Sequence, residues 1–150
     1  MRPLFVLLGT FIISLILLRL VAGDFDYALS GRIAMSVMLL FTTIGHFVFP
    51  KGMTMMMPDF IPFKTLLVYA TGIIETLAAI GLLVNSLQQL TSILFIIFFI
   101  LILPANINAA IKHVDYEKAT HEGSGIKYLW FRVPLQVLFI AWTFFFGLNW

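Results

Sequence analysis

Residues 65–84, TLLVYATGIIETLAAIGLLV, decide how this chain folds, because they read as a membrane-spanning helix with one charge at its centre. A stretch of about 20 apolar residues is long enough to cross the hydrocarbon core of a bilayer as a helix. Glu75 is the only charged residue in the stretch. A carboxylate at this depth costs at least ~2.5–3.5 kcal/mol on insertion scales, so we expect it to face protein or a cavity.

The composition of the whole chain also indicates a membrane protein. Hydrophobic residues make up 61% of the 150 residues and charged residues only 11%, whereas soluble domains are about half apolar and about a quarter charged. The formal net charge of +2 is small and scattered, so it does not predict a nucleic-acid partner. Because the chain has no cysteine, disulfides, thiolate metal sites and dithiol redox chemistry are excluded.

Five apolar segments are bounded by polar residues, at about 3–22, 33–49, 65–84, 90–111 and 128–148. In lipid each must be a helix, because an open sheet would leave backbone groups unpaired. The sequence therefore predicts an all-α polytopic bundle of five transmembrane helices in a single membrane domain, residues 1–150. The first segment resembles a cleavable signal sequence, but Arg19 stands between the apolar run and the small-residue site, so we favour a retained helix.

Lysine and arginine are divided unevenly between the two sides of this bundle. Seven lie at the amino terminus and in the second and fourth loops, and two lie on the other side. The seven are Arg2, Lys51, Lys64, Lys112, Lys118, Lys127 and Arg132, and the two are Arg19 and Arg32. By the positive-inside rule, the N-terminus and both larger loops are predicted to be cytoplasmic.

Polar residues of four predicted helices lie at compatible depths in the cytoplasmic half. At ~1.5 Å per helical residue, His46 lies ~6 Å and Asn106 ~9 Å inside the ends of their helices. Arg132 and Gln136 lie ~6 and ~12 Å inside theirs and share one face, because they are four residues apart. Glu75 is the deepest, at ~16 Å. Together these residues predict a polar pocket that opens toward the cytoplasm or the inner leaflet.

Simpler interpretations stay open for the same residues. Polar side chains in membrane bundles often form interhelical hydrogen bonds worth ~0.6–2 kcal/mol, and Glu75 could lie buried and protonated without a role. The methionines of residues 53–57 resemble a Cu(I) ligand set, but an interfacial turn is favoured. His113 and His121 lie in a polar loop, for which a solvated, mobile segment is favoured over a metal site. No metal site is predicted.

A set of short motifs spans residues 32–142. They are GHF at 45–47 with Pro50, MP at 57–58, IPF at 61–63, YATGIIE at 69–75, GLL at 81–83, LPAN at 103–106 and YLWFRVPLQ at 128–136. Together they resemble the DoxX-like family of small bacterial integral membrane proteins. The common unit of that family has four spanning helices, so the segment at 3–22 would be an additional N-terminal helix.

The DoxX-like resemblance implies a protein of the bacterial inner (cytoplasmic) membrane with a redox association. Named relatives include a quinone-reducing thiosulfate oxidoreductase subunit and a subunit of a membrane-associated oxidoreductase complex. The family residues that map onto this chain are His46, Glu75, Asn106, Arg132 and Gln136, the same residues that the depths bring together.

The predicted site therefore has His46 and Glu75 as candidate catalytic residues. The candidate ligand-binding residues are Thr42, which shares a helix face with His46, Tyr69 of the matched motif, Asn106, Arg132 and Gln136. Quinone chemistry needs hydrogen-bond donors and a proton supply, which His46 and Glu75 could provide. Arg132 would stabilise negative charge on the ligand.

The predicted function is binding of a lipophilic small molecule, a quinone or a lipid, as part of or alongside a membrane redox system. The cofactor is unassigned, with quinone as a candidate, and a partner protein would have to supply electrons. Three alternatives stay open: a non-catalytic subunit whose polar cluster only packs helices, a small proton-coupled transporter, and a lipid-modifying enzyme. Besides the bilayer itself, a homo-oligomeric partner is also left open.

Overall fold

The computed structural model describes residues 2–149, and every regular element in that range is a helix. The elements are α1 (Arg2–Ala22), α2 (Tyr27–Val48), α3 (Pro50–Met56), α4 (Lys64–Gly81), α5 (Gln88–Ile111) and α6 (Ile126–Leu148). All except α3 are long and apolar enough to cross a membrane. The predicted all-α bundle with five spanning helices is confirmed, and the helices indicate a membrane protein.

Two local features differ from the prediction. α2 begins at Tyr27 instead of Ile33, because the Asp26 carboxylate caps it and accepts a hydrogen bond from the Leu29 N–H at 2.8 Å. The methionine-rich stretch predicted as a turn forms the short helix α3. Its first residue is Pro50, whose fixed φ and missing N–H suit the first turn of a helix.

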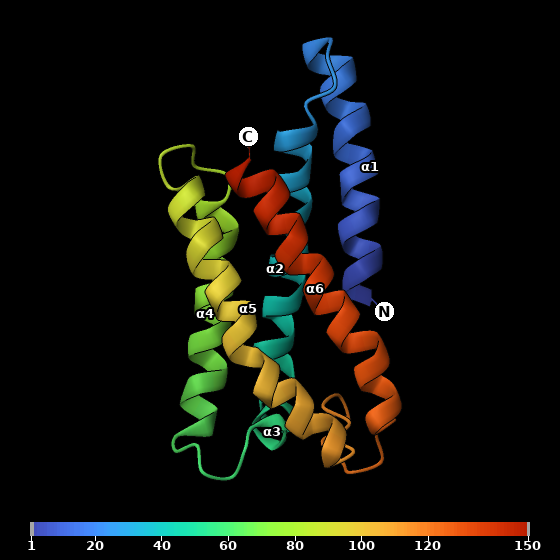
Figure 1. The fold of residues 1–150 in the computed structure, drawn as a ribbon, viewed down its shortest axis with the longest axis vertical. Coiled ribbons are helices and arrows are strands. Elements are labelled where there is room, and N and C mark those ends of the chain that lie inside the picture. The colour runs from blue at the N-terminus through green and yellow to red at the C-terminus, as the bar shows by residue number, and fades with distance from the viewer. Residues whose placement is uncertain (1, 150) are drawn as a thin grey trace.

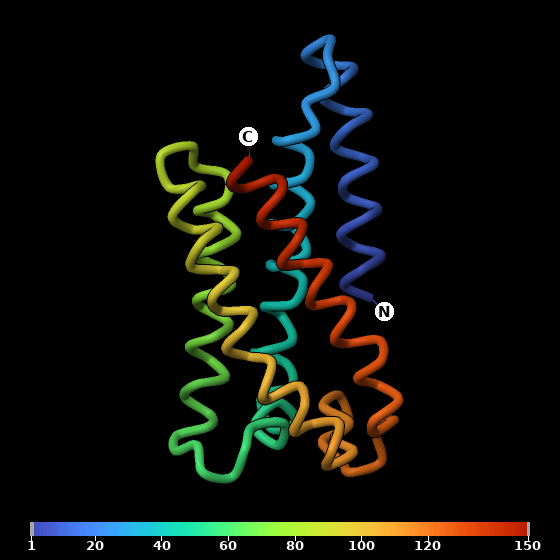
Figure 2. Tube along the Cα trace, viewed as in Figure 1, coloured from blue at the N-terminus to red at the C-terminus, as the bar shows by residue number. Residues whose placement is uncertain are grey.

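α2 is the central helix of the bundle and packs against α1, α4 and α6, while α5 packs along α6 (Figure 1). The chain trace in Figure 2 shows α1 beginning near mid-height of the bundle and extending beyond the other helices at its far end. Most of α1 is exposed, as expected for a helix that faces lipid on three sides. The half of the bundle that carries α3, called the lower bundle below, is therefore formed by four spanning helices, α2, α4, α5 and α6.

The apolar core lies between α2, α4, α5 and α6, with Met35, Leu39, Phe95, Leu135 and Phe139 among its buried side chains. Close approach of α4 to α2 depends on a glycine. A Cβ placed at Gly72 would lie 2.9 Å from the His46 Cβ, which is shorter than any ordinary van der Waals contact. The glycine of the YATGIIE motif thus brings α4 against the histidine of α2.

The end of the bundle that carries α3 is closed by the segment between α5 and α6. Asp59 forms ion pairs with Lys112 at 2.7 Å and Lys64 at 3.4 Å, and the hydrogen bond from Lys112 contributes most to lowering the pKa of this carboxyl. The Tyr116 ring packs edge-on against Phe49, and burial raises the pKa of its phenol. This segment, predicted to be solvated, is partly buried and contacts the chain on both sides of α3, at Phe49 and at Asp59.

Candidate functional site

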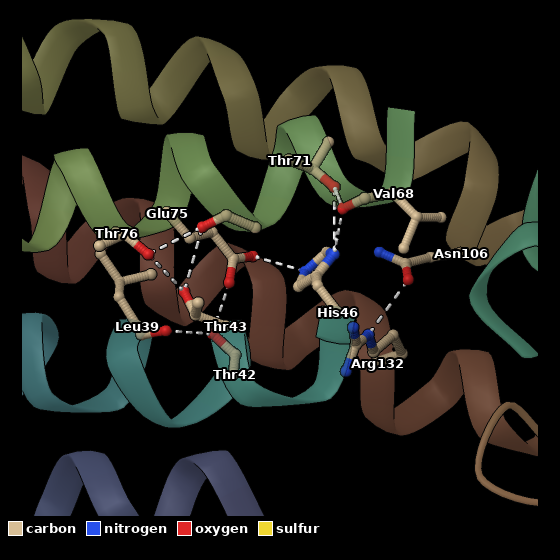
Figure 3. A network of polar contacts seen from close by, with 11 residues as sticks. Leu39, Thr42, Thr43, His46, Val68, Thr71, Glu75, Thr76, Asn106 and Arg132 are labelled. Atoms are coloured by element: carbon tan, nitrogen blue, oxygen red, sulfur yellow. Dashed lines mark hydrogen bonds and ion pairs between the residues drawn. The ribbon is translucent and has the colours of Figure 1, made fainter. Parts of the chain in front are cut away.

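His46 of α2 and Glu75 of α4 face each other in the middle of the bundle (Figure 3). The His46 Nε2 lies 3.3 Å from the Glu75 Oε1. Both side chains are largely buried, with exposed fractions of 14% and 9%. The two predicted catalytic residues, 29 positions apart in the sequence, are therefore in direct contact.

The surroundings of the imidazole fix which nitrogen carries its proton. His46 Nδ1 lies 3.0 Å from the Val68 carbonyl oxygen, which can only accept a hydrogen bond, so Nδ1 must be the donor. Nε2 of a neutral ring is then an acceptor, and its contact with Glu75 needs a proton on one of the two atoms. The pair holds that proton either as neutral imidazole with a carboxylic acid or as imidazolium with a carboxylate.

Two threonine hydroxyls complete the surroundings of the pair. Thr42 Oγ1 lies 2.8 Å from the second carboxyl oxygen of Glu75 and 3.0 Å from the Leu39 carbonyl oxygen. Its single proton can therefore go to either acceptor, and its oxygen can accept from a protonated Glu75. Thr71 Oγ1 lies 3.1 Å from His46 Nδ1 and donates to the Val68 carbonyl. The hydroxyls thus support either protonation state of the pair.

A second polar group connects α5 to α6. The Asn106 side chain donates to the Gln136 Oε1 at 3.0 Å, and the Gln136 amide donates to the Phe99 carbonyl. Arg132 Nε donates to the Asn106 Oδ1 at 3.3 Å. In the view of Figure 3, Asn106 and Arg132 lie toward the His46 end of the network, away from Thr76. The guanidinium also lies over the Tyr128 ring, 5.9 Å from its centroid.

These two groups line one cavity of about 510 Å³. Polar residues form a band around its middle, contributed by all four helices of the lower bundle. Beyond that band, toward the centre of the bundle, the walls are apolar and include Met38, Phe98 and Phe139. The cavity therefore continues past Glu75, the deepest of the predicted polar residues, and this residue lies in the wall of the pocket.

Six of the seven predicted site residues line this cavity: Thr42, His46, Glu75, Asn106, Arg132 and Gln136. Tyr69 does not. Its ring stacks on Phe47, with 5.7 Å between the ring centroids, and the residue is 36% exposed. It follows Val68 on α4 and so points about 100° away from the wall that Val68 and Thr71 form. The geometry gives no support to its predicted place among the ligand-binding residues.

Several cavity residues could not be found by ranking polar groups by depth. Met53, Met56 and Met57 of the α3 region and Tyr116 of the segment before α6 line the same space. The methionines indicated a flexible apolar surface, but no sequence signal placed that surface against α2. Among residues 2–149, no group of three or more His, Asp or Glu side chains is arranged to hold a metal ion.

The fold and the site together define a polytopic helical membrane protein. Four of its helices enclose a cavity whose walls carry a band of polar side chains. Residues 35–147, more than half of the chain, match the family described as Domain of unknown function (DUF8561), and the chain belongs to this family. α1 lies outside the matched range, whereas every predicted site residue lies inside it. No curated protein and no solved structure matches the chain.

Proposed function

We propose that this protein binds one lipophilic small molecule, a quinone or a lipid, in the cavity between α2, α4, α5 and α6. The observation that carries the proposal is the cavity of about 510 Å³, with apolar inner walls and a polar band at its middle. Ligand sites in proteins measure about 300–1,000 Å³ and are mostly apolar with a few placed polar groups. An apolar tail against Phe98 and Phe139 would leave a polar head beside His46.

The His46–Glu75 pair supports a chemical role toward such a head group. Its single proton lies between two largely buried atoms, and Thr42 can receive or donate a hydrogen bond in either state. A ligand oxygen within hydrogen-bond distance of the pair could gain or lose a proton without water. The redox part of the proposal, with a partner protein as electron donor, depends on the DoxX-like resemblance alone.

The proposed location is the bacterial inner membrane, with the amino terminus and the α3 end on the cytoplasmic side. Charge supports this orientation: Lys64 and Lys112 lie at the α3 end, and Arg2 pairs with Glu117 of the segment before α6 at 3.3 Å. The cavity then lies in the cytoplasmic half of the bundle.

One observation favours the alternative in which the polar groups only pack helices. The side-chain amides of Asn106 on α5 and Gln136 on α6 form a hydrogen bond with each other, as interhelical amide pairs do in membrane bundles. All four residues line the cavity, but His46 and Glu75 can exchange a proton with a ligand, whereas the two amides cannot. The packing role is therefore assigned to the amide pair and the ligand role to the histidine and the glutamate.

A cavity-filling substitution tests the proposal. The full chain, purified in a nonionic detergent, is titrated with a short-chain prenylated benzoquinone and with a lysophospholipid, and bound ligand is measured by native mass spectrometry. We expect one equivalent of one of these ligands on the parent, loss of binding in Ala105→Phe, which adds a ring inside the cavity, and normal binding in Ala141→Phe. Ala141 is exposed on α6 outside this cavity.

Two results would overturn the proposal. One is that neither ligand binds the folded parent. The other is that Ala105→Phe binds as tightly as the parent, which would show that the bound molecule is elsewhere, on the lipid-facing surface.

A further inference from the structure

One of the charged side chains that line the cavity has no partner of opposite charge. Five of its residues are arginine, histidine or glutamate, and four of these are paired with each other. Arg2 pairs with Glu117 at 3.3 Å and His46 with Glu75 at 3.3 Å. Arg132 is the fifth, and it has no carboxylate partner among residues 2–149.

The Arg132 guanidinium also has unused hydrogen-bonding capacity. It carries five N–H donors and a fixed positive charge. Only Nε has a hydrogen-bond partner, the Asn106 Oδ1 at 3.3 Å. The two terminal nitrogens have none in the described part of the chain, and the residue is only half-buried. Asn106 and the Tyr128 ring hold the planar group in place at the cavity wall.

The position of Arg132 separates the polar and apolar parts of the cavity. It is six residues into α6, ~9 Å from the start of the helix, whereas the apolar wall residue Phe139 is seven residues further along. An elongated molecule with its tail at Phe98 and Phe139 would place its head at the level of Arg132 and His46. A guanidinium fork matches the two oxygens of a carboxylate or phosphate.

We infer that the ligand of this cavity is a long-chain acid, whose carboxylate or phosphate oxygens bind the terminal nitrogens of Arg132. The inference rests on the proposed function and narrows it, because a neutral quinone or alcohol would leave the guanidinium without a counter-charge. His46 and Glu75 would then contact the head group from the α2 and α4 side.

The test compares four ligands with similar apolar tails: hexadecanoate, hexadecyl phosphate, hexadecanol and a prenylated benzoquinone. Their affinities for the full chain in nonionic detergent are measured by native mass spectrometry. We expect the acids to bind about 10- to 100-fold more tightly than the alcohol, the range expected for hydrogen bonds to charged groups. The ratio of the two acids decides between a fatty acid and a lipid phosphate.

Two variants of Arg132 and one control variant test whether this arginine causes the preference for acids. Arg132→Gln should abolish the preference for acids and leave alcohol binding unchanged. Arg132→Lys, which keeps the charge without the fork, should retain part of the preference, and it carries the test if Arg132→Gln does not fold. Arg19→Gln removes an exposed arginine outside the cavity and should bind like the parent.

The outcomes separate the inference from the proposed function. If the alcohol or the quinone binds the parent as tightly as the acids, the inference is wrong and the proposed function stands. If the acids are preferred but neither Arg132 variant changes that preference, the inference is also wrong. If none of the four ligands binds the folded parent, the proposed function fails and the inference fails with it.

Discussion

Replacing Glu75 by glutamine should leave the fold intact and remove the exchangeable proton of the site. The amide oxygen of the introduced glutamine can accept from the Thr42 hydroxyl, now 2.8 Å from the carboxyl, and its NH2 can donate to the His46 Nε2, now at 3.3 Å. Both contacts of the buried side chain are retained. We therefore expect Glu75→Gln to change the free energy of unfolding by less than ~1 kcal/mol, the net value of one hydrogen bond.

Glu75→Ala provides the contrast. It leaves the His46 Nε2 without a partner in a largely buried position, and an unsatisfied buried group costs about 1–3 kcal/mol. Thr42 keeps its bond to the Leu39 carbonyl and adds little to the loss. The alanine variant should thus be less stable than the glutamine variant by ~1–3 kcal/mol, measured from the midpoints of thermal unfolding in detergent.

The functional assay is the affinity of the parent and of Glu75→Gln for the best-binding of the four ligands, measured at one pH. Glutamine keeps the shape and the hydrogen bonds of Glu75 but cannot give or take a proton, so we expect Glu75→Gln to bind the ligand more weakly than the parent. A glutamine variant with the stability and the affinity of the parent would falsify proton handling at Glu75 and favour a packing role.

Three further predictions concern the framework of the site. Gly72→Ala should destabilise the bundle by ~1–3 kcal/mol by overpacking against His46, whereas Gly9→Ala, with nothing within 4 Å of the added Cβ, should be neutral or stabilising in the same thermal assay. A double-mutant cycle of Asn106→Ala and Gln136→Ala should give a coupling energy of ~0.6–1.7 kcal/mol, and a value of zero would contradict the 3.0 Å hydrogen bond. The lowered pKa of Asp59 stabilises the folded state above the unfolded value of 3.8, and this contribution is lost as the pH falls through the folded pKa. Unfolding of Asp59→Asn should therefore depend less on pH between about 2 and 5, and equal slopes for both proteins would contradict the ion pairs.

The helices were predictable because membrane insertion leaves the backbone few choices. Once apolar length is known, the helical form and the approximate ends follow. The start of α2 was missed because its first residues, Tyr27 to Arg32, are polar enough to resemble a loop. The hydrogen bond from the Leu29 N–H to the Asp26 carboxylate caps the helix and sets its start at Tyr27. α3 was missed because seven residues carry too little periodicity to distinguish a helix from a turn.

His46 and Glu75 were predicted to belong to one polar cluster, since polar side chains in the same half of the membrane avoid lipid by facing protein. Their direct contact was not predicted, because the predicted depths of ~6 and ~16 Å differ by ~10 Å. Tyr69 was included because it belongs to the YATGIIE motif, and a motif match does not give direction around a helix. The residue lies on the outer face of α4 beside Phe47. The Val68 carbonyl that orients the imidazole is a backbone atom and leaves no sequence signal. That Arg132 lacks a carboxylate partner among residues 2–149 also needed the structure, because it depends on which residues pair.

The central claim is that a lipophilic molecule occupies the cavity between α2, α4, α5 and α6. An experimental density map of the protein purified from its own membrane tests this claim most directly. The account predicts elongated density that contacts His46 and Arg132 with its head and extends toward Phe98 and Phe139. Side chains that fill the same space in a well-resolved map, with no room for a ligand, would contradict it.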